Sequence, residues 1–158
     1  MIIPPNISSN EPLLRAFSLP SGLDGEKRAT PLIFRLHSNE KDISLTRLLY
    51  DNLMDFLKKS SSFIFKFLSP NDEPAGAVEL IAGEVASLSQ NILVKATPSK
   101  NNPAHASIYY LLSNGKCYKQ PKRTTVPTDP TILGYEMALA AVVHKIYDLR
   151  GNVIWMSK

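Results

Sequence analysis

Asn114-Gly115 stands between two runs, 106–112 and 116–120, in which apolar and polar side chains alternate. Alternation with a period of two is typical of a strand with one buried face. An Asn-Gly pair between such runs favours a two-residue type I′ turn, because both central residues need a positive φ, which these two residue types adopt at least cost. We therefore expect a β-hairpin here, and a fold of this chain must include a sheet that holds it.

The two-residue turn also predicts which side chains share a face of the hairpin. It pairs Ser113 with Lys116 and Leu112 with Cys117, and the period of two then divides the other side chains. The face expected to cover the core holds Ile108, Tyr110, Leu112 and Cys117, with Lys119 near its rim. The other face is expected to mix aromatic rings, cations and hydrogen-bonding groups, and it holds His105, Ser107, Tyr109, Leu111, Lys116, Tyr118 and Gln120.

Apolar spacing along the rest of the chain predicts the other elements. Apolar residues three and four apart predict helices over 44–58, 74–90 and 131–149, the last beginning at Asp129-Pro130. Alternating or β-prone runs predict strands at 32–37, 63–68, 92–97 and 153–156. A chain of 158 residues is long enough for one domain. We expect a single α+β domain over 31–158, with three helices on one face of a mixed, largely antiparallel sheet of about five to six strands.

The first thirty residues contain Pro4, Pro5, Pro12 and Pro20, and they predict an irregular N-terminal arm over 1–30, because proline fixes φ and lacks a backbone donor. The arm also carries apolar residues, namely Ile2, Ile3, Leu13, Leu14 and Phe17. These side chains need a surface to cover them, either on the arm's own domain, which we favour, or on a second copy of the chain. In the second case they form a self-association surface and the protein is a homo-oligomer.

Charge is distributed unevenly along the sequence. The net charge is +4, yet residues 85–128 hold six lysines and arginines and no aspartate or glutamate. Such a stretch produces a local positive field that attracts phosphate groups and other anions. Lysines on a sheet can also serve only to prevent edge-to-edge aggregation, so the charge pattern does not by itself identify a ligand.

The hairpin face and the charge pattern together predict a non-enzymatic nucleic-acid-binding protein, with RNA or single-stranded DNA as its ligand. Bases stack on tyrosine rings while lysines neutralise the phosphates beside them. The residues expected to bind are Lys95, Lys100, His105, Tyr109, Lys116, Tyr118, Lys119, Lys122 and Arg123. The alternative is a solvated sheet face whose tyrosines only cover apolar surface, and the sequence holds no known RNA-binding motif.

Other classes of function remain as alternatives. A structural or protein-interaction module would use the arm and the exposed tyrosines as contact points. Membrane-surface attachment would use Lys58, Lys59 and Lys66, although core packing explains the nearby apolar stripe better. A small hydrolase or nuclease would need catalytic groups that only the fold brings together.

Residues that could carry catalysis or hold a metal are few. Cys117 as a nucleophile would need His105 or His144 as its base, but the expected register places Cys117 and His105 on opposite faces. One cysteine and three scattered histidines predict no metal site, and the glycines form no phosphate-binding loop, so we expect no cofactor. The sequence shows no signal peptide and no apolar stretch of about 20 residues, so we expect a cytoplasmic or otherwise intracellular protein.

Overall fold

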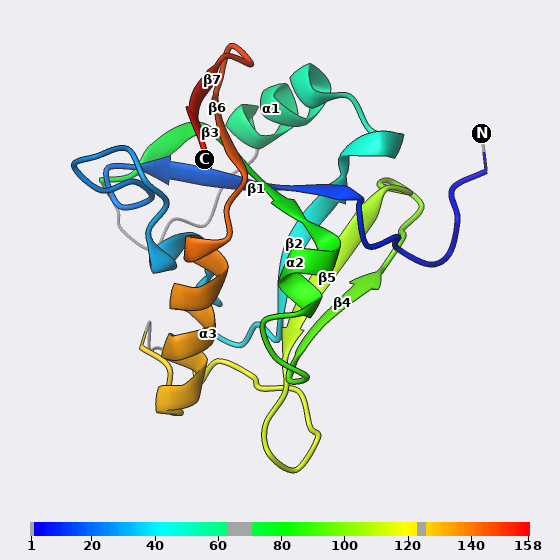
Figure 1. The fold of residues 1–158 in the computed structure, drawn as a ribbon, viewed down its shortest axis with the longest axis vertical. Coiled ribbons are helices and arrows are strands. Elements are labelled where there is room, and N and C mark those ends of the chain that lie inside the picture. Colours follow the sequence, from blue (N-terminus) through cyan, green and yellow to red (C-terminus); the bar gives the residue numbers. More distant parts are fainter. Residues whose placement is uncertain (1, 63–70, 123–125) are drawn as a thin grey trace.

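The computed structural model describes residues 2–62, 71–122 and 126–158 (Figure 1). In chain order its elements are β1 (Pro12–Leu19), the 3-10 helix η1 (Pro31–Phe34), β2 (Asp42–Arg47), the 3-10 helix η2 (Leu48–Tyr50), α1 (Leu53–Ser62), β3 (Glu73–Ile81), α2 (Ala82–Ala86), β4 (Ile92–Ala96), β5 (His105–Tyr110), α3 (Pro130–Ala141), β6 (Lys145–Asp148) and β7 (Val153–Met156).

Seven strands within these ranges form one open sheet in the order β4-β5-β2-β1-β3-β6-β7, and each neighbouring pair is antiparallel. Three α-helices accompany the sheet in the same ranges. The α+β prediction is therefore confirmed, with slightly more strands than the five or six expected.

β1 lies in the middle of this sheet, between β2 and β3. Pro12 opens the strand and Pro20 follows its end, so neither ring removes an N–H group from the middle of the ladder. The prediction of an irregular arm is therefore wrong for residues 12–19. Its prolines mark the two ends of a strand instead of excluding one.

Different helices cover the two faces of the sheet. Leu13 and Leu14 are neighbours in β1 and belong to different cores, because successive residues of a strand point to opposite faces. α2 and α3 contribute Val85 and Leu139 to the larger core, on the Leu13 side. α1 covers the opposite face, where Leu57 packs in the same small core as Leu14. The prediction that all helices lie on one face is therefore wrong.

Several expected elements have a different structure. The segment predicted as a helix over 44–58 begins as β2, and α1 starts only at Leu53. The predicted helix over 74–90 is the strand β3 followed by the short α2. The first half of the strand expected at 32–37 is η1, and its second half is irregular. Residues 76–80 of β3 are buried on both faces, so their apolar side chains show no alternation that could have indicated a strand. The strand expected at 63–68 lies outside the described residues.

Other expectations are confirmed. β4, β5 and β7 occupy the strands expected near 92–97, 106–112 and 153–156. α3 begins as predicted, with Pro130 in its first turn and the Asp129 carboxylate accepting from the Thr131 N–H at 2.9 Å, although it ends at Ala141 and the chain then forms β6. Among the described residues, no helix combines the length and the hydropathy needed to cross a membrane.

Candidate nucleic-acid interface

The hairpin after β5 has a turn one residue longer than expected. The Gly115 N–H donates to the carbonyl oxygen of Leu112 at 2.9 Å, and the Leu112 N–H donates to that of Lys116 at 2.8 Å. Gly115 has a φ of +81°, whereas Asn114 does not have a positive φ. This is the pattern of a three-residue loop, a type I turn followed by a left-handed glycine. The predicted type I′ turn is therefore wrong.

One additional turn residue shifts the returning segment by one position. Leu111 pairs with Cys117, and the Tyr118 N–H donates to the carbonyl oxygen of Tyr110 at 2.7 Å. A one-residue shift moves every side chain of a strand to the other face. Tyr118 is consequently in the core, only 4% exposed, while Cys117 is exposed. The placement of Lys116, Tyr118 and Gln120 on the binding face, and of Cys117 on the core face, is therefore wrong, because Lys116 now lies across from Leu112.

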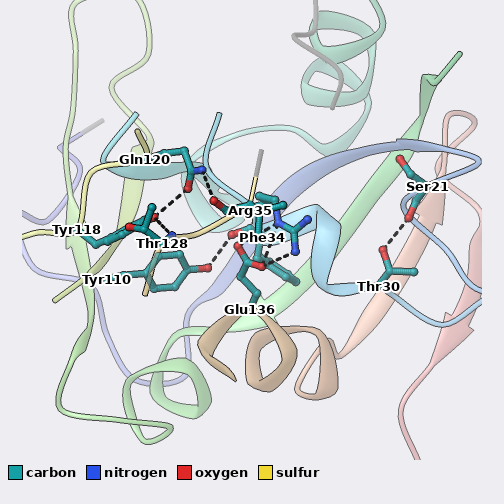
Figure 2. A network of polar contacts seen from close by, with 10 residues as sticks. Ser21, Thr30, Phe34, Arg35, Tyr110, Tyr118, Gln120, Thr128 and Glu136 are labelled. Carbon is teal, nitrogen blue, oxygen red and sulfur yellow. Dashed lines mark hydrogen bonds and ion pairs between the residues drawn. The ribbon is translucent and has the colours of Figure 1, made fainter. Parts of the chain in front are cut away.

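Tyr118 belongs to a polar network inside the molecule (Figure 2). Its hydroxyl donates to Oε1 of Gln120 at 3.3 Å and accepts from the Thr128 N–H at 3.0 Å. The neighbouring Tyr110 donates its hydroxyl to the carbonyl oxygen of Phe34 at 2.7 Å, and burial raises the pKa of Tyr110. These contacts join the hairpin to η1 and to the loop before α3, so both rings have structural roles.

A buried ion pair completes this interior region (Figure 2). Arg35 donates from Nε and Nη2 to Oε1 of Glu136 at 3.2 and 3.0 Å, and the Glu136 side chain is almost fully buried. Burial raises the pKa of Glu136, and the Arg35 guanidinium opposes that rise. The pair fixes α3 against the segment after η1. Its only signal in the sequence is a single carboxylate within an otherwise apolar helix.

The predicted binding residues that remain together lie on the sheet face opposite the larger core. β5 contributes His105, Ser107 and Tyr109 to this face, since Ala106, Ile108 and Tyr110 between them point into the larger core. Register then places Lys95 of β4 and Asp42 of β2 on the same face, because Lys95 pairs with Ser107 and Asp42 pairs with Tyr109. We call this surface the polar face, and its side chains are those of Asp42, Lys95, Thr97, His105, Ser107 and Tyr109.

Exposed lysines lie on the polar face and beyond both ends of β5. Lys95 is exposed at its middle, Lys100 is exposed in the loop that precedes β5, and Lys116 is exposed in the turn that follows it. Lys119 and Lys122 are exposed farther along the returning segment, and Arg123 lies outside the described residues. The fold therefore brings a cation to each end of the strand that carries Tyr109.

The polar face also holds an acidic residue that the count over 85–128 could not reveal. Asp42 comes from β2, and its Oδ2 accepts from the Ser107 hydroxyl at 2.9 Å. Ser107 lies within 2.8 Å of the Thr97 hydroxyl, which in turn lies 2.8 Å from Nδ1 of His105. Asp42 lies in β2, His105 and Ser107 lie in β5, and Thr97 directly follows β4. Sequence spacing therefore gives no indication that these four side chains meet.

Two of the alternative sites are changed by the structure. Cys117 faces Leu111, and His105 is six residues from Leu111, which amounts to about 20 Å along a strand. Cys117 and His105 therefore do not form a nucleophile and base. The apolar side chains of α1 pack against the sheet, as Leu57 shows, so the stripe beside Lys58 and Lys59 is used within the chain.

The expected self-association residues are divided by the structure. Leu13, Leu14 and Phe17 are buried in the two cores of their own chain, so they are not available to a second copy. Ile3 is half-buried, and Ile2 is 94% exposed. The alternative that this region packs on its own domain is therefore confirmed for the three β1 residues, and their assignment to a surface for a second copy is corrected.

A scan against protein-family models, a search of curated proteins and a search of solved structures each give no match.

Proposed function

We propose that this protein binds single-stranded nucleic acid on the polar face, with RNA as the leading ligand and single-stranded DNA as the other. The observation that carries the proposal is the position of Tyr109 relative to Lys95. Leu93 pairs directly with Tyr109, so Lys95 is a diagonal neighbour of Tyr109 on the same face, at a spacing of roughly 7–8 Å between such residues. A base on the tyrosine ring would thus have a cation beside its phosphate.

The two side chains supply the two contributions that single-strand binding requires. Stacking of one base on an aromatic ring is worth about 1–3 kcal/mol, and every base has a face that can stack. Lysines neutralise phosphates and release counterions, which makes the affinity dependent on salt. Lys100 and Lys116, at the two ends of β5, extend the attraction beyond Lys95. We assign binding to Lys95, Lys100, His105, Tyr109, Lys116, Lys119 and Lys122, and to neither Tyr118 nor Gln120.

The proposal is tested by fluorescence anisotropy of a labelled RNA of about 20 nucleotides, at low and near-physiological salt. Wild-type protein is compared with Tyr109→Ala and Lys95→Ala, and Lys158→Ala serves as a control because Lys158 is an exposed lysine at the far end of the chain. We expect binding that weakens with salt and with both polar-face variants. Binding that is insensitive to salt would contradict phosphate contact. Because RNA and single-stranded DNA are found inside cells, the proposal includes an intracellular location.

Self-association is a second candidate function, now supported by β7 in place of the N-terminal region. β7 lies at one end of the described sheet, and its Val153, Ile154 and Met156 are 49%, 36% and 54% exposed. An apolar edge strand without lysine or proline is a template for another strand. We propose a second copy of this chain as the partner, because antiparallel pairing of two identical strands closes a two-fold dimer.

Sedimentation velocity distinguishes this candidate from nucleic-acid binding. If β7 forms the dimer, wild-type protein sediments as a dimer at micromolar concentration, and Met156→Lys sediments as a monomer because the charge prevents edge pairing. A monomeric wild type over the whole concentration range contradicts the β7 dimer and leaves the polar face unaffected.

A further inference from the structure

Four side chains of the polar face form one continuous hydrogen-bonded chain. It runs from His105 Nδ1 to the Thr97 hydroxyl at 2.8 Å, to the Ser107 hydroxyl at 2.8 Å, and to Oδ2 of Asp42 at 2.9 Å. Ser107 is 1% exposed, whereas His105 and Asp42 at the two ends of the chain are only half-buried, so both ends lie nearer to solvent than Ser107 does. We call these four residues the relay.

The acceptors in the relay determine where its hydrogens lie. Nδ1 of His105 is also 3.2 Å from the backbone carbonyl oxygen of Thr97, and a carbonyl oxygen can only accept. Nδ1 therefore carries the hydrogen. At the other end the Asp42 carboxylate can only accept, so the Ser107 hydroxyl donates to it and the Thr97 hydroxyl donates to Ser107. The Nδ1 hydrogen is then shared between the hydroxyl and carbonyl oxygens of Thr97, and the side-chain hydrogen bonds run in a single direction from His105 to Asp42.

With the hydrogen on Nδ1, Nε2 of His105 carries a free lone pair at the His105 end of the relay. Among the described residues, no hydrogen bond to Nε2 is present. An imidazole whose other nitrogen is oriented by a carboxylate-terminated chain is arranged as a general base is, with its tautomer held in place. The two hydroxyl groups of the relay are committed to this chain, and Ser107 is inaccessible, so neither is a free nucleophile. The base must act on a hydroxyl that the ligand brings.

We propose that His105 is the general base of an RNA-cleaving reaction on the polar face, an inference that rests on the proposed binding of RNA. Nε2 takes the proton of a ribose 2′-hydroxyl. The 2′-oxygen then forms a bond to the adjacent phosphorus, and the bond from phosphorus to the 5′-oxygen breaks. The 5′-oxygen takes a proton from water, and the imidazolium returns its proton to solvent. The products are a 2′,3′-cyclic phosphate and a 5′-hydroxyl, and no other reactant is consumed.

The other polar-face residues have definite parts in this reaction. Lys95 is exposed, and it pairs with Ser107, a member of the relay, across the β4–β5 ladder. Its ammonium group is therefore placed to contact the phosphate, whose negative charge increases as the 2′-oxygen attacks. Thr97, Ser107 and Asp42 do not touch the substrate. They are positioning residues, which hold His105 in the tautomer with a hydrogen on Nδ1.

The test follows a labelled RNA and its all-deoxy counterpart of the same sequence, each with EDTA present, and measures binding and cleavage separately. Wild-type protein should cleave RNA to cyclic-phosphate ends and leave the DNA intact. His105→Gln should still bind RNA, because Tyr109 and Lys95 are unchanged, and should cleave it at least about 100-fold more slowly, given the usual contribution of a general base. His144→Gln, a histidine outside the polar face, should keep full activity.

The outcomes separate the two proposals. RNA that is bound but remains intact overturns the catalytic inference and leaves the proposed function in place. Absence of binding overturns the proposed function and the inference with it. Equal cleavage by wild type and His105→Gln shows that the activity does not come from His105, and also overturns the inference.

A matched pair of variants tests the relay itself. Thr97→Ser keeps the hydroxyl and should retain kcat, whereas Thr97→Val has a similar shape without the hydroxyl and should lower kcat several-fold with KM unchanged. Nitrogen-15 NMR of wild-type His105 gives a readout that needs no variant to fold. A hydrogen on Nδ1 is expected, and a hydrogen on Nε2 in the neutral ring overturns the assignment of His105 as a base.

Discussion

Arg47 and Glu11 form an ion pair with both side chains buried, and Nε of Arg47 lies 2.5 Å from Oε1 of Glu11. The same guanidinium donates to the carbonyl oxygens of Pro4 and Asn6, at 2.6 and 3.2 Å, and lies 4.8 Å from the centre of the Tyr50 ring. One side chain at the end of β2 therefore holds the segment that precedes β1. The Arg47 guanidinium is therefore paired with the Glu11 carboxylate, although burial removes both charges from water.

Replacement of Arg47 should destabilise the fold strongly. Arg47→Met leaves the Glu11 carboxylate buried without its partner, and such a loss costs about 3–5 kcal/mol of the free energy of unfolding. Urea unfolding measures the difference. The double variant Arg47→Met, Glu11→Leu should recover a large part of the loss, because no charge then remains buried. A loss below about 1 kcal/mol in Arg47→Met would mean that the pair behaves as an exposed one.

The second buried ion pair, Arg35 with Glu136, should make the free energy of unfolding depend on pH in a defined direction. Burial raises the pKa of Glu136 above its usual value, and Arg35 limits the rise. A carboxyl whose pKa is higher in the folded state holds its proton more tightly when folded, so its contribution to stability is lost as pH rises through the folded pKa. Without Arg35 the pKa of Glu136 rises further. Arg35→Met should therefore be destabilised by about 3–5 kcal/mol at neutral pH and by less near pH 5.

Urea unfolding of wild type, Arg35→Met and Arg35→Lys at these two pH values provides the measurement. Arg35→Lys retains a cation near Glu136 and should lose less than Arg35→Met at neutral pH. An identical loss in Arg35→Met at both pH values contradicts this account of the pair.

The three-residue turn predicts that Gly115 matters more than Asn114. Alanine at 115 meets no atom within 4 Å, so its cost is only that of a left-handed backbone at φ +81°, about 1–2 kcal/mol. Asn114→Ala keeps an ordinary backbone and loses one exposed hydrogen bond, from the Lys116 N–H to Oδ1, so it should cost about 0.5 kcal/mol. Thermal unfolding of the two variants gives the order. A larger loss for Asn114→Ala would indicate the two-residue turn instead.

Two tyrosines of the hairpin should respond differently to loss of the hydroxyl. Tyr118→Phe removes a donor to Gln120 and leaves the Thr128 N–H without its acceptor, so the free energy of unfolding should fall by about 1–3 kcal/mol. Tyr109→Phe keeps a ring on the polar face and should change neither stability nor RNA affinity by much. Chemical unfolding and anisotropy on both variants check this, and weaker RNA binding by a folded Tyr118→Phe would reopen its assignment to the interior.

Local signals in the sequence were sufficient for part of the fold. β4, β5, β7 and the start of α3 follow from alternation and from the Asp129-Pro130 cap. β1 and β3 were missed because burial on both faces removes the alternation that marks a strand, and because Pro12 and Pro20 are compatible with a strand when they stand at its ends.

The candidate site shows where such reasoning stops. Tyr109 was assigned to the predicted binding face from the alternation of its own strand, whereas Lys95 was a candidate only through the charge pattern. The pairing of β4 with β5 brings the two side chains to one face. Tyr118 was misplaced by a single residue of turn length, which reverses the faces of the segment that follows. Asp42 was missed because its contact with Ser107 depends on the pairing of β2 with β5, two strands that are far apart in the sequence. Thr97 was missed because its contacts with His105 and Ser107 depend on the register of β4 against β5.

The salt dependence of RNA binding tests the central claim most directly. A plot of the logarithm of affinity against the logarithm of salt concentration has a slope of roughly −0.7 for each phosphate contact to a single strand. Lys95→Ala should therefore reduce the slope by about 0.7, while Tyr109→Ala should weaken binding by about 1–3 kcal/mol and leave the slope unchanged. If both variants bind RNA with the affinity and slope of wild-type protein, the polar face is not the binding surface.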